Sequence, residues 1–275
     1  MNRSSSCLLA SALTAGMLLS TAACSSGGGD SGSGHTEVSA SALAKEAPTK
    51  SPSASATPSL TEAQARSALI TNADLGSQWT ETEGAATWRD ALLKSKVDAS
   101  AFVENKGDAA DCQQLLDGLY AEDLLGTPKG AQAVTGFDDS DNEGQMRYQV
   151  AAYDRAGLDS KLAWMQTLPT KCDQFTAIDN KGGKQTVQVV SASPPDVGDA
   201  RVGLQMTMTG ELDGNPSTLT LDIGAVRVGD NAIYVTNGGL NGSDGNSTVQ
   251  AVEAGTQRLQ DVMSGKTPPQ APTPS

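Results

Sequence analysis

Four segments in the second half of the chain have the composition of β-strands and are separated by turn residues. They span residues 185–190, 201–208, 217–229 and 231–237. The turns between them are marked by Pro194-Pro195, Asp213-Gly214 and Gly229-Asp230-Asn231. Since short turns connect antiparallel neighbours and parallel strands need long crossovers, this half of the chain predicts an antiparallel sheet.

The first half adds helices and two more strands. Residues 131–137 and 145–153 fit strands, and helices fit residues 59–70, 111–125 and 158–168, the last ending before Pro169. Capping boxes at Ser59–Glu62 and Ser247–Gln250 predict where the first helix and a final helix, ending near Gly265, begin. These patterns indicate an α+β fold: a single domain with a twisted antiparallel sheet and helices packed mainly on one face.

The N-terminal residues have the features of an export signal. Residues 1–23 contain an early Arg3, a short apolar run and small residues, which is typical of a secretory signal peptide. Thr21-Ala22-Ala23-Cys24 resembles the bacterial lipobox, although Thr21 stands where leucine is usual. We therefore expect Cys24 to carry lipid and to anchor the protein at the outer face of the cell membrane. The alternative is an ordinary signal peptide with a cysteine nearby by chance.

Composition divides the rest of the chain into three parts. Residues 24–58 are rich in Ser, Gly, Ala and Pro and predict a disordered tether, because such a segment buries too little apolar surface to fold. Residues 59–265 carry the periodic patterns and form the expected sensor-like domain. Residues 266–275 predict a disordered tail.

Two cysteines remain for the expected folded domain. Cys112 and Cys172 are 60 residues apart, and in an exported protein such a pair predicts one disulfide. A two-cysteine metal site and a redox pair are the alternatives, but the spacing is far from C-x-x-C.

The charge balance excludes some partners. Formal net charge is −13, from 19 Lys and Arg against 32 Asp and Glu, and no basic run occurs. This argues against nucleic-acid binding and against electrostatic docking to anionic lipid, so membrane contact is expected through the lipid anchor alone. We interpret the acidity as a source of solubility in preference to a cation-binding role.

Several stretches together resemble a known family. They are LITNADLGSQW (69–79), DCQQLL (111–116), KCDQF (171–175), PPDVGDARVGL (194–204) and VRVGDNAIYV (226–235). In this order they resemble the PknH-type extracellular sensor domains and related lipoproteins of actinobacteria. The resemblance implies an α/β sandwich-like domain with a cleft that binds an unidentified ligand at the cell envelope. Kinase sensor domains commonly carry two disulfides, whereas this chain can make only one within the domain.

The residues give little support for catalysis. The only histidine, His35, lies in the expected tether, which excludes histidine-dependent triads and histidine-ligated zinc from the domain. We expect no enzyme activity, cofactor or metal, with a carboxylate-pair hydrolase as the catalytic alternative. DDSDNEG (138–144) is similar to a calcium loop, but the twelfth position counted from Asp139 is Val150, where such a loop needs a carboxylate, so a polar hairpin turn is preferred.

Four residues are candidates for ligand contact. Trp79 and Trp88 flank a polar loop, and large aromatic side chains often line clefts, although they more often belong to a core, as expected for Trp164. Asp199 and Arg201 follow the double-proline turn, where they face a ligand or form a local ion pair that holds the loop. The expected function is a lipid-anchored, extracytoplasmic, sensor-like domain that binds an envelope ligand. The alternative is an envelope lipoprotein that binds a membrane protein through an apolar patch or an edge strand.

Overall fold

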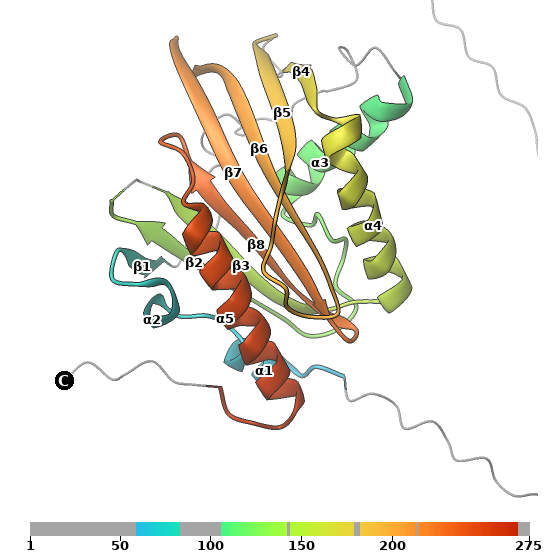
Figure 1. The fold of residues 1–275 in the computed structure, drawn as a ribbon, viewed down its shortest axis with the longest axis vertical. Helices are drawn as coiled ribbons and strands as arrows, with labels where there is room; N and C mark the ends of the chain where they lie inside the picture. Colours follow the sequence, from blue (N-terminus) through green and yellow to red (C-terminus); the bar gives the residue numbers. More distant parts are fainter. Residues whose placement is uncertain (1–58, 83–105, 142–143, 179–181, 213, 269–275) are drawn as a thin grey trace, which may run out of the picture. The chain divides into compact units, whose positions relative to one another are not determined.

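The computed structural model describes residues 59–82, 106–141, 144–178, 182–212 and 214–268. These residues form an eight-stranded sheet with helices on its two faces (Figure 1). The strand order is β1-β2-β3-β8-β7-β6-β5-β4, and every neighbouring pair is antiparallel. The α+β prediction with a single antiparallel sheet is confirmed.

The longest strands lie in the second half of the chain. The strands are β1 Trp79–Thr82, β2 Gln132–Asp139, β3 Gln145–Ala152, β4 Gln174–Ile178, β5 Lys184–Ala192, β6 Ala200–Leu212, β7 Asn215–Val228 and β8 Asn231–Gly239. The helices are α1 Glu62–Ser67, α2 Asn72–Leu75, α3 Lys106–Ala121, α4 Arg155–Lys171 and α5 Gly245–Met263. Within the described ranges, no helix combines the length and the apolar composition that a membrane span requires.

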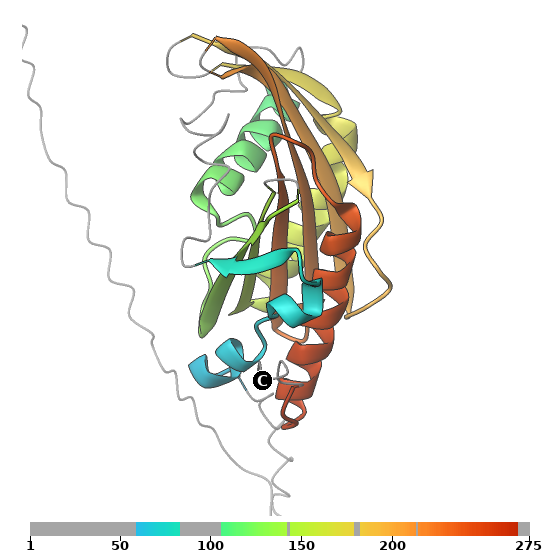
Figure 2. The ribbon, with the colours of Figure 1, turned by 90° about the vertical axis from the view of Figure 1, so that its left-hand side faces the viewer.

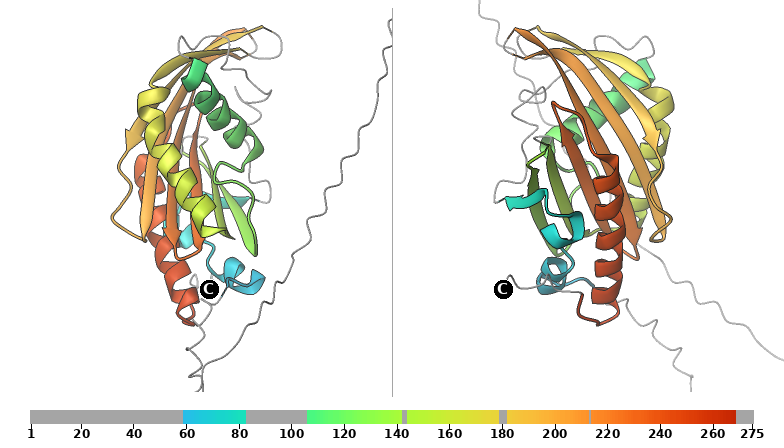
Figure 3. Two further views of the ribbon diagram at one scale, coloured as in Figure 1. Left: turned by 90° about the vertical axis from the view of Figure 1, so that its right-hand side faces the viewer. Right: turned by 60° about the vertical axis from the view of Figure 1, so that its left-hand side comes forward.

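A hydrophobic core lies on each face of the sheet, and helices cover both faces (Figures 2 and 3). We call them the α4 face, which α3 and α4 cover, and the α5 face, which α1, α2 and α5 cover. On the α4 face the strands contribute Val187, Val189, Leu204, Met206, Leu219, Leu221, Ile223 and Tyr234. On the α5 face they contribute Phe137, Met146, Tyr148, Val150, Val226, Ile233 and Val235.

The expectation of helices mainly on one face was therefore wrong in that detail. Residues 232–235 of β8 are consecutive and all buried, with Ala232 and Tyr234 in one core and Ile233 and Val235 in the other. Since successive side chains of a strand point to opposite faces, a run of this kind needs cover on both sides of the sheet.

The caps of α1 and α5 are other residues than predicted. Thr61, not Ser59, caps α1: its hydroxyl accepts from the Gln64 N–H at 3.3 Å, and its own N–H donates to Gln64 Oε1 at 2.9 Å. The cap of α5 is Asp244, whose Oδ1 accepts from the Asn246 N–H at 3.0 Å. Ser247 instead donates its hydroxyl to Asp244 Oδ2 at 2.6 Å, so it lies inside the first turn of α5.

The ends of α3 and α4 also differ from the prediction. Helix α3 ends at Ala121, short of the predicted Leu125, because Glu122 takes the left-handed backbone conformation with φ +59°. Helix α4 continues past Pro169 to Lys171, although a proline was expected to end it. The Cys172 N–H donates to the Leu168 carbonyl at 2.7 Å, so the last turn closes without the N–H that Pro169 lacks.

Candidate functional site

Trp79, the first of the predicted ligand residues, lies in the core of the α5 face. It is 2 % exposed, and its indole Nε1 donates to the Ser247 hydroxyl at 3.0 Å. Ser247 in turn donates to Asp244, the cap of α5. In the described structure Trp79 therefore joins the start of β1 to the start of α5.

The other tryptophans lie elsewhere. Trp88 is outside the described residues. Trp164 of α4 packs against the core of the α4 face with part of its ring exposed, and its Nε1 donates to Asp111 Oδ1 at 2.8 Å. The Lys161 ammonium lies 5.1 Å from its ring centroid, a cation–π distance.

Asp199 and Arg201 have separate partners. Asp199 Oδ2 accepts from the Gly229 N–H at 2.7 Å and from Arg227 Nη1 at 3.2 Å, which joins the start of β6 to the turn between β7 and β8. Arg201 forms an ion pair with Asp196. The structure thus gives both side chains local contacts that hold the chain around β6.

The two cysteines of the domain form a disulfide in the structure. It joins Cys112 of α3 to Cys172 at the end of α4. Cys24 lies outside the described residues. Of the acidic stretch 138–144, Asp138 and Asp139 end β2, and Asp139 Oδ1 accepts from the Asp141 N–H at 2.9 Å; Asn142 and Glu143 are outside the described residues.

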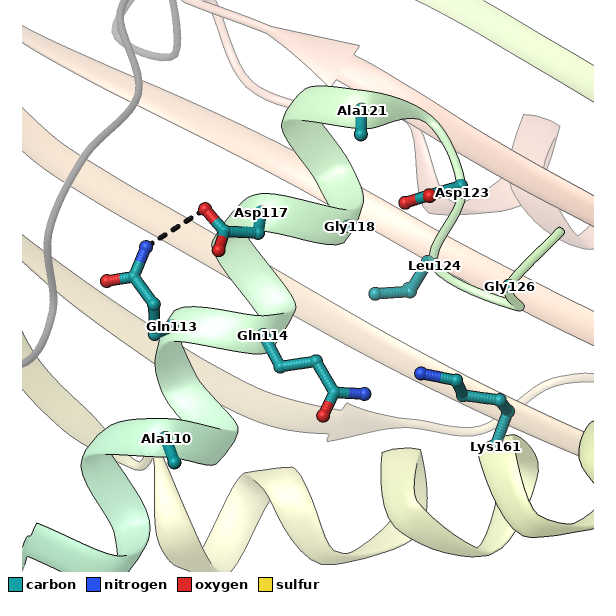
Figure 4. Close-up of a pocket in the computed structure, with 10 residues that line it drawn as sticks. All are labelled: Ala110, Gln113, Gln114, Asp117, Gly118, Ala121, Asp123, Leu124, Gly126 and Lys161. Atoms are coloured by element: carbon teal, nitrogen blue, oxygen red, sulfur yellow. Dashed lines mark hydrogen bonds between the residues drawn. The ribbon is translucent and has the colours of Figure 1, made fainter. Parts of the chain in front are cut away.

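A groove of about 540 Å3 lies between α3, the following turn and α4 (Figure 4). Its polar side chains come mainly from α3, where Gln113 Nε2 donates to Asp117 Oδ1 at 3.0 Å, while Lys161 reaches in from α4. Most of the lining residues are exposed or half-buried. Such a groove holds a small ligand poorly, because water competes for each of its polar groups.

A second cavity, of about 380 Å3, is better enclosed. We call it the α5 pocket. It is lined by residues 192–195 between β5 and β6, by residues 203–205 of β6, by residues 222–224 of β7, and by the first turns of α5. It lies on the α5 face, and Figure 1 shows the chain between β5 and β6 passing on the same side of the sheet as α5.

The floor of the α5 pocket has no side chains. Gly203 and Gly224 are directly opposite each other in the β6–β7 register. A Cβ at Gly203 would lie 3.0 Å from Pro194 Cδ, and one at Gly224 would lie 2.8 Å from Val252 Cγ2. Two glycines at these positions therefore let the proline turn and α5 approach the sheet closely, with the cavity over the floor.

A row of polar side chains crosses the sheet beside this floor. Gln205, Asp222 and Asn237 are register partners on β6, β7 and β8. Gln205 Nε2 donates to Asp222 Oδ1 at 2.9 Å, and Asn237 Nδ2 donates to the Asp244 carbonyl at 2.9 Å and to Thr248 Oγ1 at 3.0 Å. The row thus holds the first turn of α5 on the sheet.

Asp222 is the unusual member of this row. It is 5 % exposed, and its Oδ2 has no hydrogen-bond partner among the described residues. Oδ2 would be 3.7 Å from a Cβ at Gly245, so it faces the start of α5 where that helix lines the pocket. A buried carboxylate oxygen without a donor is costly, which makes Oδ2 a candidate contact for a ligand donor.

Sequence reasoning did not identify Asp222 as a site residue. A single charged residue in the mostly apolar strand segment LTLDIGAV was the available signal, and Gly224 two residues later was the second. Their meaning depends on pairing with Gln205 and Gly203, which only the strand register reveals.

Comparisons with known proteins add a structural likeness. Neither the protein-family models nor the curated proteins include a match. Among solved structures, the chain is similar to the crystal structure of the extracellular domain of PknH from Mycobacterium tuberculosis, with 16% sequence identity and a TM-score of 0.41. The match covers 77% of this chain and 100% of that one. The family expected from the sequence is thus represented among the structural neighbours, at low similarity and without a match at the level of sequence families.

Proposed function

We propose that this protein is an exported, lipid-anchored binding protein whose folded domain takes a small ligand into the α5 pocket without catalysis. The observation that carries the proposal is the buried Asp222 Oδ2, which has no donor among the described residues and lies beside a cavity with apolar walls. Pockets with few polar groups among apolar walls are the usual form of a small-molecule site. The signal-like residues 1–23 and the disulfide support export.

The acidic residues that line the α5 pocket favour a binding role over hydrolysis. Asp222 is the only acidic residue among those that line the pocket in the described structure. A carboxylate-pair hydrolase needs a second carboxyl group across the substrate.

A small ligand is also favoured over a protein partner. The large hydrophobic side chains that are exposed in the described part of the chain are Val134, Val190 and Leu240. Val134 is the register partner of Gln149 on the α4 face, whereas Val190 is the partner of Gln205 on the α5 face. Isolated positions on opposite faces do not form an apolar patch of the size that partner proteins use.

Ligand screening of the full-length protein in mild detergent tests the pocket. A ligand at about 100 times its Kd adds about 2.7 kcal/mol of stability, which a thermal-shift panel of envelope lipids, cell-wall fragments, sugars and amines detects. Val249 is half-buried on the pocket side of α5, so Val249→Phe should fill the cavity and abolish any stabilisation. A ligand that stabilises this variant as well as the wild type would place binding elsewhere.

The anchor is tested separately. Cys24→Ala removes the only thiol that can take lipid at the end of the signal, so the protein should leave the membrane fraction. Fractionation of cells that make the wild type or the variant measures this. Retention of the variant in membranes would disprove the lipid anchor and leave the pocket untouched.

A further inference from the structure

We propose that the α5 pocket selects organic cations, namely a protonated amine on an apolar body that pairs with Asp222. This inference rests on the proposed function, because it names the class of ligand for the same pocket. It follows from the charge of the lining, from the hydrogen bonds already made there, and from the apolar walls.

The charge of the pocket favours a cation. Asp222 is its one acidic residue, and no Lys, Arg or His lines it in the described structure. Arg201, the base nearest in sequence to the lining segments, is paired with Asp196. A cation thus meets unbalanced negative charge at a buried position, where the interaction is strongest.

The existing hydrogen bonds leave one acceptor for the ligand. Oδ1 of Asp222 accepts from Gln205 Nε2 at 2.9 Å, so the remaining direction for a new donor is Oδ2. Carboxylates form their strongest hydrogen bonds with charged donors. An ammonium group supplies such a donor together with the missing positive charge.

An anion is disfavoured, although helix N-termini often bind anions. Asp244 already occupies the start of α5: its Oδ1 accepts from the Asn246 N–H at 3.0 Å, and its backbone carbonyl accepts from the Thr248 N–H at 3.2 Å. An incoming anion would therefore meet a capped helix and the Asp222 carboxylate.

The walls select a cation with an apolar body. Pro194 and Pro195 line one part of the pocket, and Val249 and Val252 of α5 line another. Against these surfaces a hydrated inorganic ion gains nothing, whereas each buried methylene of an organic ligand contributes about 0.8 kcal/mol. With about 380 Å3 of space, the pocket admits a ligand the size of a short alkyl amine or a larger one.

Three hexyl compounds that differ in head group test the inference on the full-length protein in mild detergent. Hexylammonium, hexanol and hexanoate have the same apolar body and carry a positive, neutral and negative head. Ligand-observed NMR titration should give hexylammonium the lowest Kd, about tenfold or more below that of hexanol, and no binding of hexanoate. The variants are Asp222→Asn, which is isosteric, and Val249→Phe, which fills the cavity. Glu253→Gln is the matched control, since it removes one exposed carboxylate from α5, the helix that also carries Val249.

The inference requires that Asp222→Asn weaken hexylammonium about tenfold or more and that Glu253→Gln leave it unchanged. Equal binding of hexanol and hexylammonium, both abolished by Val249→Phe, would overturn the cation inference while the pocket and the proposed function stand. Hexylammonium binding that survives both Asp222→Asn and Val249→Phe would overturn the site itself. Failure of all three compounds to bind the wild type would also overturn the inference, and the wider ligand panel would then decide the proposed function.

Discussion

At the scale of single residues, Asp222 has a cost that the fold alone does not explain. Asp222 is 5 % exposed, yet only one of its two carboxylate oxygens has a hydrogen-bond partner in the described structure. A well-packed apolar or amide side chain would avoid this cost. Residues that lower stability in this way are typical of binding sites, where the missing partner comes with the ligand.

Asp222→Asn should therefore stabilise the free protein. The amide keeps the acceptor for Gln205 Nε2 and removes a buried charge, so we expect a gain of about 1 kcal/mol and a Tm increase of about 2–4 °C. Thermal unfolding of the wild type and the variant without ligand measures this. A lower Tm for the variant would mean that the carboxylate has a structural partner, and it would remove the stability argument for a ligand.

At the scale of the elements, the wall of the α5 pocket is positioned by two strands. Trp79 at the start of β1 donates to Ser247, and Asn237 of β8 donates to the Asp244 carbonyl and to Thr248. These bonds connect residues up to 168 positions apart. Local sequence patterns predicted that α5 starts at Ser247, because a capping box depends on only four neighbouring residues. Asp244 caps the helix instead, because of its contacts with the sheet.

The α3–α4 pair on the other face allows a test of the disulfide. The loop between Cys112 and Cys172 spans 60 residues, so the bond should add about 4 kcal/mol by limiting the unfolded chain. Denaturant unfolding of Cys112→Ala/Cys172→Ala should show that loss. The Asp111–Lys171 ion pair at 2.6 Å and the Trp164–Asp111 bond still hold the helices together, so the native helix content should remain.

The control for this prediction is the wild type in reductant, which should unfold at the same denaturant concentration as the double variant. Alkylation without reductant should leave both cysteines of the wild type unmodified. Modification of both would disprove the disulfide.

At the scale of the whole domain, the sequence predicts the class of the fold better than its layers. Short turns were sufficient to predict antiparallel strands, and the four consecutive apolar residues 232–235 contained the signal that the sheet is buried on both faces. Strands β1 and β4 were not predicted: each is short, and each is defined by pairing at an edge of the sheet. The α5 pocket could not be predicted, because it arises where two glycines and two polar residues from separate strands become register partners.

The two cores make a prediction at alkaline pH. Burial raises the pKa of Tyr148 on the α5 face and of Tyr234 on the α4 face far above the usual value, although Arg258 and Arg147 respectively act in the opposite direction. Burial likewise raises the pKa of Tyr153 to about 12. In the unfolded chain each phenol loses its proton near pH 10. Below that pH both states hold the protons and stability is unaffected.

Above about pH 10 the unfolded state alone loses these protons, so stability should fall by about 1.4 kcal/mol per pH unit for each buried tyrosine. Because Tyr148 and Tyr234 lie in different cores, their ionisation reports whether the two faces unfold together. We expect one cooperative transition between about pH 10 and 12, in which tyrosinate absorbance rises as far-ultraviolet circular dichroism is lost. Two separate transitions would mean that one face opens before the other, since loss of a single core would release only its own tyrosine.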